Sequence, residues 1–308
     1  MCCANAARPS PTRTASPEMT ADAANRRGAA LMSIAMACYV LNDACVKLST
    51  DRLPPGQVLA VRGIFAVAIL FTIAVTLHRL QGGWRMVLQP LVALRCVLEL
   101  ATALASVFAL AMIPLAMVTS LMMTAPLMIS IAAMYLRWEQ WNARRLAGTL
   151  AGLLGVLIIV RPQDGLTSLP PWGIASALLC AALLGARELA TRRLPPDAPS
   201  WMVALAAAVA VCVGGGALGL TEHWSPLEPK DGGLLAAAAL CAALGNYALI
   251  AACRRGDLSA IVPFRYTNIV WALIAGYVLW NDTPDRQAFL GIAMIVAGGL
   301  LSMSRQRP

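Results

Sequence analysis

The sequence predicts an all-α integral membrane protein with ten transmembrane helices, arranged as two inverted five-helix repeats. Of its 308 residues, 59% are apolar and only 13% are charged, whereas soluble globular chains carry about 25% charged residues. Mean hydropathy is +0.70, and apolar runs recur along the whole length. Segments in the two halves also resemble each other at offsets of 143 and 145 residues. These observations exclude a soluble enzyme with a single membrane anchor.

Ten apolar runs are long enough to form membrane-spanning helices. Each such helix needs about 20 mostly apolar residues. The charge-free stretch from Leu100 to Leu136 is too long for one span, and Pro114 predicts a turn that divides it. The expected spans are 29–48, 56–77, 90–110, 115–136, 144–160, 172–191, 200–220, 233–253, 260–280 and 287–303.

The distribution of basic residues predicts the orientation of these spans, because Lys and Arg in short loops stay cytoplasmic. If the N-terminus is inside, fifteen of the 24 basic residues are cytoplasmic and five lie within spans. Only four lie outside, namely Arg52, Arg161, Lys230 and Arg286. We therefore expect a multi-pass protein of a bacterial inner membrane, with both termini cytoplasmic.

Residues 1–27 are rich in Pro, Ser, Thr and Arg and lack the apolar core of a signal peptide. We expect a disordered cytoplasmic tail here. Met19 is an alternative start of the natural chain, and an organelle transit peptide is a second alternative.

The rest of the chain divides into two similar parts, 28–162 and 163–308. An offset of 143 aligns Glu139 with Asp282, Gly148 with Gly291 and Gly155 with Gly298. An offset of 145 aligns Gly28 with Gly173, Asp43 with Glu188 and Lys47 with Arg192. Because five spans per copy is an odd number, the second copy lies upside down relative to the first. Inverted repeats place a substrate site at their interface.

Several motifs in both parts resemble the EamA module of the drug/metabolite transporter superfamily. The first copy shows Thr124-Ala125-Pro126-Leu127, Trp138-Glu139-Gln140-Trp141 and Ile158-Ile159-Val160-Arg161-Pro162. The second shows Pro263-Phe264-Arg265-Tyr266 and Trp280-Asn281-Asp282-Thr283-Pro284, with Asp282 where the family more often has Glu. The resemblance implies ten helices in two inverted halves around a cavity that opens alternately to each side. It also implies a substrate among amino acids, nucleotide-like metabolites, cofactors, sugar phosphates or drugs.

Ionisable residues inside spans are costly and suggest function. Glu99 is the deepest acid, about 14 Å into its span at about 1.5 Å per residue. Arg95 lies one turn earlier on the same face. Two interpretations stay open: a neutralising ion pair, or a carboxylate that accepts a proton or a cationic group of the substrate. Glu99 is accordingly the candidate for proton coupling.

Other polar residues at depth complete the expected site, although packing or helix–helix hydrogen bonds would explain them equally well. Lys47, Arg187 and Arg192 lie near span ends, where we expect their side chains to snorkel to the headgroups. The candidate substrate-binding residues are Asn42, Asp43, Arg62, Arg95, Glu99, Asn246, Tyr247, Arg265, Tyr266 and Trp271.

Small residues and prolines are expected to control packing and movement. Gly148-xxx-Gly152 and Gly215-xxx-Gly219 have a spacing that lets membrane helices approach closely, and a homodimer through such helices is one expectation. Pro126 and Pro263 are positioned as hinges.

The sequence contains no HExxH, P-loop or Gly-x-Ser-x-Gly motif and no set of Cys or His metal ligands. We therefore expect no enzyme activity, cofactor, metal or nucleic-acid partner. The leading hypothesis is a secondary active transporter that moves a small polar metabolite by alternating access, with proton coupling as one option. The alternative is a non-transporting membrane scaffold or sensor.

Overall fold

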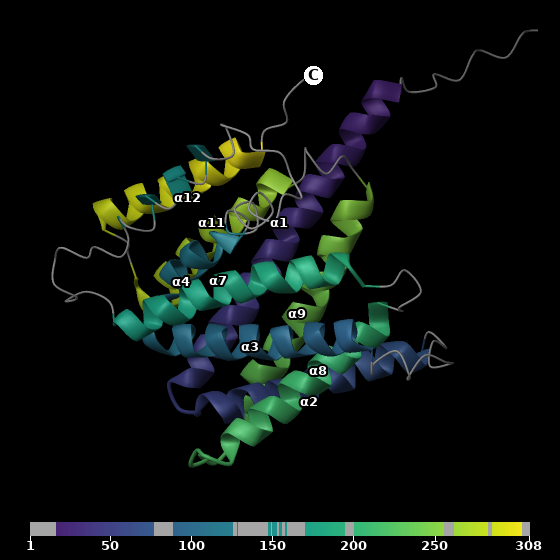
Figure 1. Cartoon of the computed structure of the whole chain (residues 1–308), viewed down its shortest axis with the longest axis vertical. Helices are drawn as coiled ribbons and strands as arrows, with labels where there is room; N and C mark the ends of the chain where they lie inside the picture. Colours follow the sequence, from purple (N-terminus) through teal and green to yellow (C-terminus); the bar gives the residue numbers. More distant parts are fainter. Residues whose placement is uncertain are drawn as a thin grey trace, which may run out of the picture.

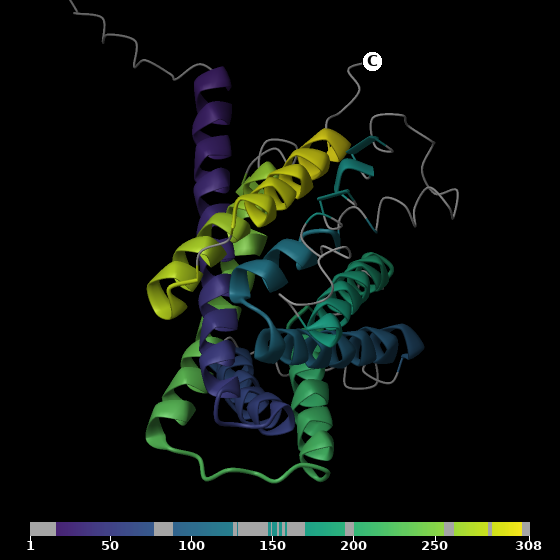
Figure 2. The same cartoon turned by 90° about the vertical axis from the view of Figure 1, so that its left-hand side faces the viewer.

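The computed structural model describes residues 17–76, 89–125, 128, 147–148, 150–152, 154–155, 158, 170–194, 200–255, 262–282 and 285–303. Every regular element within these residues is a helix. In both views, α2 and α8 lie at the end of the molecule opposite α12 (Figures 1 and 2). In chain order the helices are α1 (Pro17–Thr50), α2 (Pro55–Thr76), α3 (Pro90–Met112), α4 (Leu115–Met122), α7 (Pro171–Arg192), α8 (Ser200–Gly219), α9 (Pro229–Arg255), the 3₁₀ helix η2 (Val262–Tyr266), α11 (Thr267–Trp280) and α12 (Arg286–Met303).

Proline marks the start of many of these helices. It is favoured in the first helical turn because the N–H group that it lacks would have no partner there. The helices that begin with proline are α1, α2, α3, α7 and α9.

Among the described residues, six helices are long and apolar enough to cross a membrane, and they match six predicted spans. They cover residues 26–50, 55–76, 90–112, 171–191, 201–219 and 229–249. The predicted spans 115–136 and 144–160 fall largely outside the described residues. Helix α1 begins at Pro17 and so includes residues 17–27 of the expected tail, whereas residues 1–16 lie outside the described residues. This segment is rich in alanine, the strongest helix former.

The charge-free stretch is divided where expected. Helix α3 ends at Met112, and Ile113 is extended, with φ −133° and ψ 160°. The next helix, α4, ends at Met122. Met122 precedes Pro126 by four residues, and a proline ring clashes with the carbonyl group at that distance. Pro126 itself, one of the two expected hinges, lies outside the described residues.

The predicted span 260–280 is not one continuous helix, which corrects the expectation. It begins with the 3₁₀ helix η2, which contains Pro263, and only then continues as α11. Pro263 is the second residue of η2 and so lies in the first helical turn, where proline is favoured. Helix α11 ends at Trp280, and the next residue, Asn281, has a left-handed φ of 56°. The N–H of Asp282 then donates to the carbonyl of Gly276 at 3.1 Å, which closes the helix.

The helix contacts occur in equivalent pairs. The offset between the halves relates α1 to α7, α2 to α8 and α3 to α9, and it relates the predicted span that begins with α4 to the one that contains η2 and α11. Accordingly, α1 packs against α9 as α7 packs against α3, and α2 contacts α9 as α8 contacts α3. Helix α2 packs directly against its own counterpart, α8, and α4 packs against α11, which belongs to the equivalent span. A two-fold axis between inverted halves produces this pattern, because each contact then recurs with the partners exchanged.

Glycines show the same relation where α12 meets the end of the first half. A Cβ atom on Gly155 would lie 2.6 Å from the carbonyl oxygen of Gly291. A Cβ atom on Gly298 would clash with the carbonyl oxygen of Gly148. The offset of 143 makes Gly148 equivalent to Gly291 and Gly155 equivalent to Gly298. The two contacts are therefore the same contact seen from opposite halves, and both require glycine for close approach.

Candidate functional site

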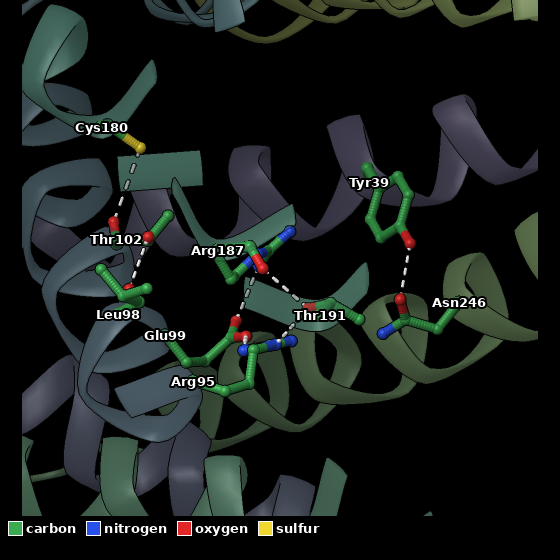
Figure 3. Close-up of polar contacts among 9 residues, drawn as sticks. All are labelled: Tyr39, Arg95, Leu98, Glu99, Thr102, Cys180, Arg187, Thr191 and Asn246. Carbon is green, nitrogen blue, oxygen red and sulfur yellow. Dashed lines mark hydrogen bonds and ion pairs between the residues drawn. The ribbon is translucent and has the colours of Figure 1, made fainter. Parts of the chain in front are cut away.

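Glu99 lies at the centre of the charged residues inside the spans. Its carboxylate accepts a hydrogen bond from Nη1 of Arg95 at 2.5 Å and from Nη1 of Arg187 at 2.9 Å (Figure 3). The exposed fractions of the Arg95, Glu99 and Arg187 side chains are 16%, 25% and 25%. One carboxylate is therefore shared by two largely buried guanidinium groups.

Thr191 completes this arrangement, which we call the Glu99 cluster (Arg95, Glu99, Arg187 and Thr191). Nε of Arg95 donates to Oγ1 of Thr191 at 2.8 Å, and that hydroxyl donates to the backbone carbonyl of Arg187 at 2.7 Å. Arg95 and Glu99 belong to α3 in the first half, whereas Arg187 and Thr191 belong to α7 in the second. The cluster therefore ties the two halves together inside the membrane.

The Glu99 cluster confirms one expectation and corrects another. The ion pair between Arg95 and Glu99, four residues apart, is present. Arg187 does not behave as a snorkelling residue; it turns to Glu99 because α7 packs along α3. The sequence signal was the spacing of Arg187 and Thr191, which places both residues on one face of α7.

Asp43 and Arg62, which we call the α1–α2 charge pair, lie beside this cluster. Arg62 interacts electrostatically with both Asp43 and Glu99. Nδ2 of Asn42 donates to Oδ1 of Asp43 at 2.8 Å. Asn42 is 5% exposed, and its Oδ1 has no hydrogen-bond partner among the described residues. Three neighbouring polar groups from α1 and α2 thus face one another without forming a closed network.

A neutral hydrogen bond joins α1 to α9. The hydroxyl of Tyr39 donates to Oδ1 of Asn246 at 2.7 Å, in the same region as the Glu99 cluster (Figure 3). The sequence had singled out Asn246 but not Tyr39. Tyr247, the neighbouring candidate residue, is not buried; 72% of it is exposed.

Lys47 also departs from the snorkelling expectation. Its Nζ donates to the carbonyl oxygens of Leu110 and Ile113, both at 2.8 Å, and lies 5.7 Å from the ring centroid of Trp280. The last carbonyls of a helix have no partner within the helix. Lys47 of the neighbouring helix α1 therefore donates hydrogen bonds to carbonyl groups at the end of α3 that would otherwise lack a partner.

The expected aromatic face near Arg265 is divided between two environments. Arg265 is half-buried and interacts electrostatically with Tyr39. Tyr266 is buried, and its hydroxyl has no hydrogen-bond partner among the described residues. Trp271 is 38% exposed, and its Nε1 donates to Oγ of Ser33 at 3.4 Å. These residues border α1 but do not touch the Glu99 cluster through any hydrogen bond seen in the described part of the chain.

Outside the spans, an exposed ionic contact joins the α1–α2 turn to the start of α9. Nη2 of Arg52 donates to Oε1 of Glu228 at 2.5 Å, and Nη1 lies 3.5 Å from Oδ2 of Asp231. The hydrogen bond from Arg52 holds the pKa of Glu228 below its ordinary value. Next to it, Gln57 exchanges hydrogen bonds with the backbone of Ser225 at 2.8 and 3.0 Å. The loop before α9 is thereby fixed to α2.

Comparison with known proteins relates this architecture to transporters. The model of the EamA-like transporter family matches residues 26–161 and again residues 171–304. A riboflavin transporter of Rhizobium johnstonii is 26% identical over 249 residues, covering 79% of this chain and 78% of the relative. A pseudopaline exporter of Pseudomonas aeruginosa is 24% identical over 281 residues, covering 90% and 93%.

A solved crystal structure shares the fold, with a TM-score of 0.60 and 20% sequence identity. The match covers 88% of this chain and 96% of that one. Family membership also assigns the chain to transporters rather than enzymes. The chain thus belongs to the EamA-like transporter family of the drug/metabolite transporter superfamily.

Proposed function

We propose that this protein is a secondary active transporter that moves a small polar metabolite across a bacterial inner membrane by alternating access. Both termini face the cytoplasm in this proposal, and the solute binds between the inverted halves next to the Glu99 cluster. The observation that carries the proposal is the sharing of Glu99 between Arg95 of one half and Arg187 of the other.

The physical argument follows from the cost of charge in a membrane. Charges inside a span are stable only when they are paired or face water. If α3 and α7 separate, Glu99 keeps Arg95 on its own helix but loses Arg187, and Arg187 then needs a new hydrogen-bond acceptor. A polar solute with acceptor atoms supplies one and so lowers the free energy of the open state. This coupling of occupancy to conformation is the requirement for alternating access.

The relatives indicate the range of solutes to test. One is named as a riboflavin transporter and another as a pseudopaline exporter. An organic metabolite is therefore the first class to examine, and the direction of transport follows the gradients imposed on it.

Thermal stabilisation by ligands tests the proposal directly, because binding to the folded state raises apparent stability. The purified protein would be screened against riboflavin, amino acids, nucleotides and sugar phosphates. We expect one class to raise the unfolding temperature of the wild type but not of Glu99→Gln. Asp51→Asn, an exposed acid at the end of α1, is the matched control and should respond like the wild type.

Proteoliposomes then test transport itself. The stabilising solute should exchange across the membrane, and an imposed pH gradient should drive its accumulation if Glu99 carries a proton. A folded wild type that neither binds nor exchanges any solute in the panel would contradict the proposal and favour a non-transporting scaffold.

A further inference from the structure

The break after α3 leaves two carbonyl groups that need a donor from outside the helix. In a regular α-helix the carbonyl of Leu110 accepts from the N–H four residues later, but that residue is Pro114, which has no N–H. The N–H of Met117, which would be the donor for Ile113, bonds to the carbonyl of Pro114 at 3.0 Å instead. Leu110 and Ile113 are each 1% exposed. Buried carbonyl groups require partners, so another element must supply them.

Lys47 of α1 supplies both donors. Its Nζ donates to the carbonyl oxygens of Leu110 and Ile113, both at 2.8 Å. An ammonium group has three donors, and the third has no acceptor in the described part of the chain. Nζ also lies 5.7 Å from the ring centroid of Trp280, the last residue of α11. Lys47 therefore lies where α1 and α3 of the first half meet α11 of the second.

The same ammonium group has a second set of partners within reach of its charge. Asp282, two residues after Trp280, interacts electrostatically with Lys47 but forms no ion pair with it among the described residues. Asp282 is half-buried, and its N–H bond to the carbonyl of Gly276 fixes its backbone at the end of α11. Asp51 also interacts electrostatically with Lys47, but it is exposed to solvent, which screens the attraction. Lys47 thus has carbonyl acceptors on α3 and a carboxylate acceptor beside α11.

We propose that Lys47 is the latch of the extracytoplasmic gate. With the gate closed, its ammonium group holds the carbonyls of Leu110 and Ile113, and the gate opens when that group moves to Asp282. This inference rests on the proposed function, whose orientation makes this end of the bundle extracytoplasmic, and it names a residue that switches between the two states.

Both states of the latch satisfy the same polar groups. In the closed state the carbonyls of α3 are dry and bonded to Lys47. In the open state α3 has moved away from α1, water bonds to the carbonyls, and Lys47 pairs with Asp282 because α11 packs against α1. Two arrangements that each leave no buried group unpaired form the kind of two-state element that a transport cycle needs.

The latch and the Glu99 cluster hold α3 at two different levels. Glu99 precedes Leu110 by 11 residues, which corresponds to about 16 Å along the helix. Releasing Lys47 frees the end of α3 near Pro114, whereas releasing Arg187 from Glu99 frees the other half of the helix. The two contacts can therefore open at different times.

Hydrogen–deuterium exchange of residues 107–119 measures opening of the latch in the purified full-length protein without any solute. Lys47→Met removes the donors, so exchange in this segment should become about 10- to 100-fold faster. Lys47→Arg keeps the charge and the donors and should lie closer to the wild type.

Asp282→Asn distinguishes a latch from a static cap on α3. Because this variant removes the acceptor of the open state, exchange in residues 107–119 should become about 3- to 10-fold slower than in the wild type. Asp282→Glu keeps the carboxylate and should behave like the wild type. Asp51→Asn, the same change at the exposed acid, is the matched control and should also leave exchange unchanged.

A static cap would give a different pattern. Lys47→Met would then exchange faster while Asp282→Asn stayed like the wild type, and this result would overturn the inference. Unchanged exchange in Lys47→Met, or faster exchange in Asp282→Asn, would overturn it as well. If Lys47→Met does not fold, Lys47→Gln, which keeps one amide donor, replaces it, and the sign of the Asp282→Asn effect still decides.

The latch and the proposed function can fail separately. If a solute binds and crosses the membrane but Asp282→Asn does not slow exchange, the transporter stands and the latch is wrong. If exchange follows the expected pattern while no solute binds or crosses, the transporter is wrong and Lys47 is a switch in a protein of another kind.

Discussion

Removing the carboxylate of Glu99 should destabilise the protein more than removing the carboxylate together with one of its arginines. In Glu99→Gln, Arg95 and Arg187 remain close together with no anion between them. In Glu99→Gln/Arg187→Gln, that repulsion is absent. The two residues should therefore show strong thermodynamic coupling in a double-mutant cycle.

The distances set the size of this effect. At the 2.9 Å between Arg187 Nη1 and Glu99 Oε1, an effective dielectric constant of 20 gives an attraction of about 6 kcal/mol. Desolvation of both groups offsets most of it. We therefore expect Glu99→Gln alone to cost about 3 kcal/mol of unfolding free energy, with a coupling of about 1–3 kcal/mol between the two positions.

Reversible unfolding in mixed detergent micelles, with SDS as denaturant, measures these free energies for the wild type, both single variants and the double variant. Asp51→Asn again serves as the control for a change in net charge. If the effects of the two single substitutions add to within about 0.5 kcal/mol, Glu99 and Arg187 do not stabilise each other. The reasoning about the Glu99 cluster would then be wrong.

Two further predictions concern other contacts between the halves. Gly63→Ala places a Cβ atom 2.7 Å from Cα of Cys212 and should lower the unfolding free energy by about 1–3 kcal/mol. The control Gly216→Ala places its Cβ atom in open space and should leave the unfolding free energy unchanged. Equal effects of the two substitutions would refute this packing argument. Because Arg52 lowers the pKa of Glu228, the charged carboxylate stabilises the folded protein at neutral pH, and Glu228→Gln should have a lower unfolding temperature there. This difference should disappear as the pH falls below the ordinary glutamate pKa of about 4.3. A difference in unfolding temperature that is independent of pH would contradict the prediction.

Much of the fold could be predicted because the bilayer imposes simple rules. Length and hydropathy identified the six long helices, and Pro114 identified the break after α3. Local backbone chemistry was harder to anticipate. The 3₁₀ segment before α11 lies inside a run that hydropathy alone predicts to be one α-helix. The helix that begins at Pro17 contains several alanines, but the Pro, Ser, Thr and Arg content of residues 1–27 led to the prediction of disorder.

The candidate site was predicted only where its contacts are local in sequence. Arg95 and Glu99 are four residues apart, so their ion pair follows from helix geometry. The contribution of Arg187 depends on which helix lies beside α3, and no single span contains that information. Tyr39 was missed for the same reason, since its partner Asn246 belongs to another half. Lys47 was misassigned because its partners are backbone carbonyls of another helix.

The two halves share a scaffold but not its chemistry. The offsets of 143 and 145 place Ala242 and Leu244 opposite Glu99, so the acid has no charged counterpart in the second half. The α3–α7 contact is therefore ionic, whereas its equivalent, α1–α9, contains the neutral bond between Tyr39 and Asn246. Separating the first pair breaks an ion pair, and separating the second breaks a neutral hydrogen bond. In the transport cycle that we propose, a solute or proton that neutralises Glu99 would act on only one of the two movements, and this inequality would let binding bias the cycle.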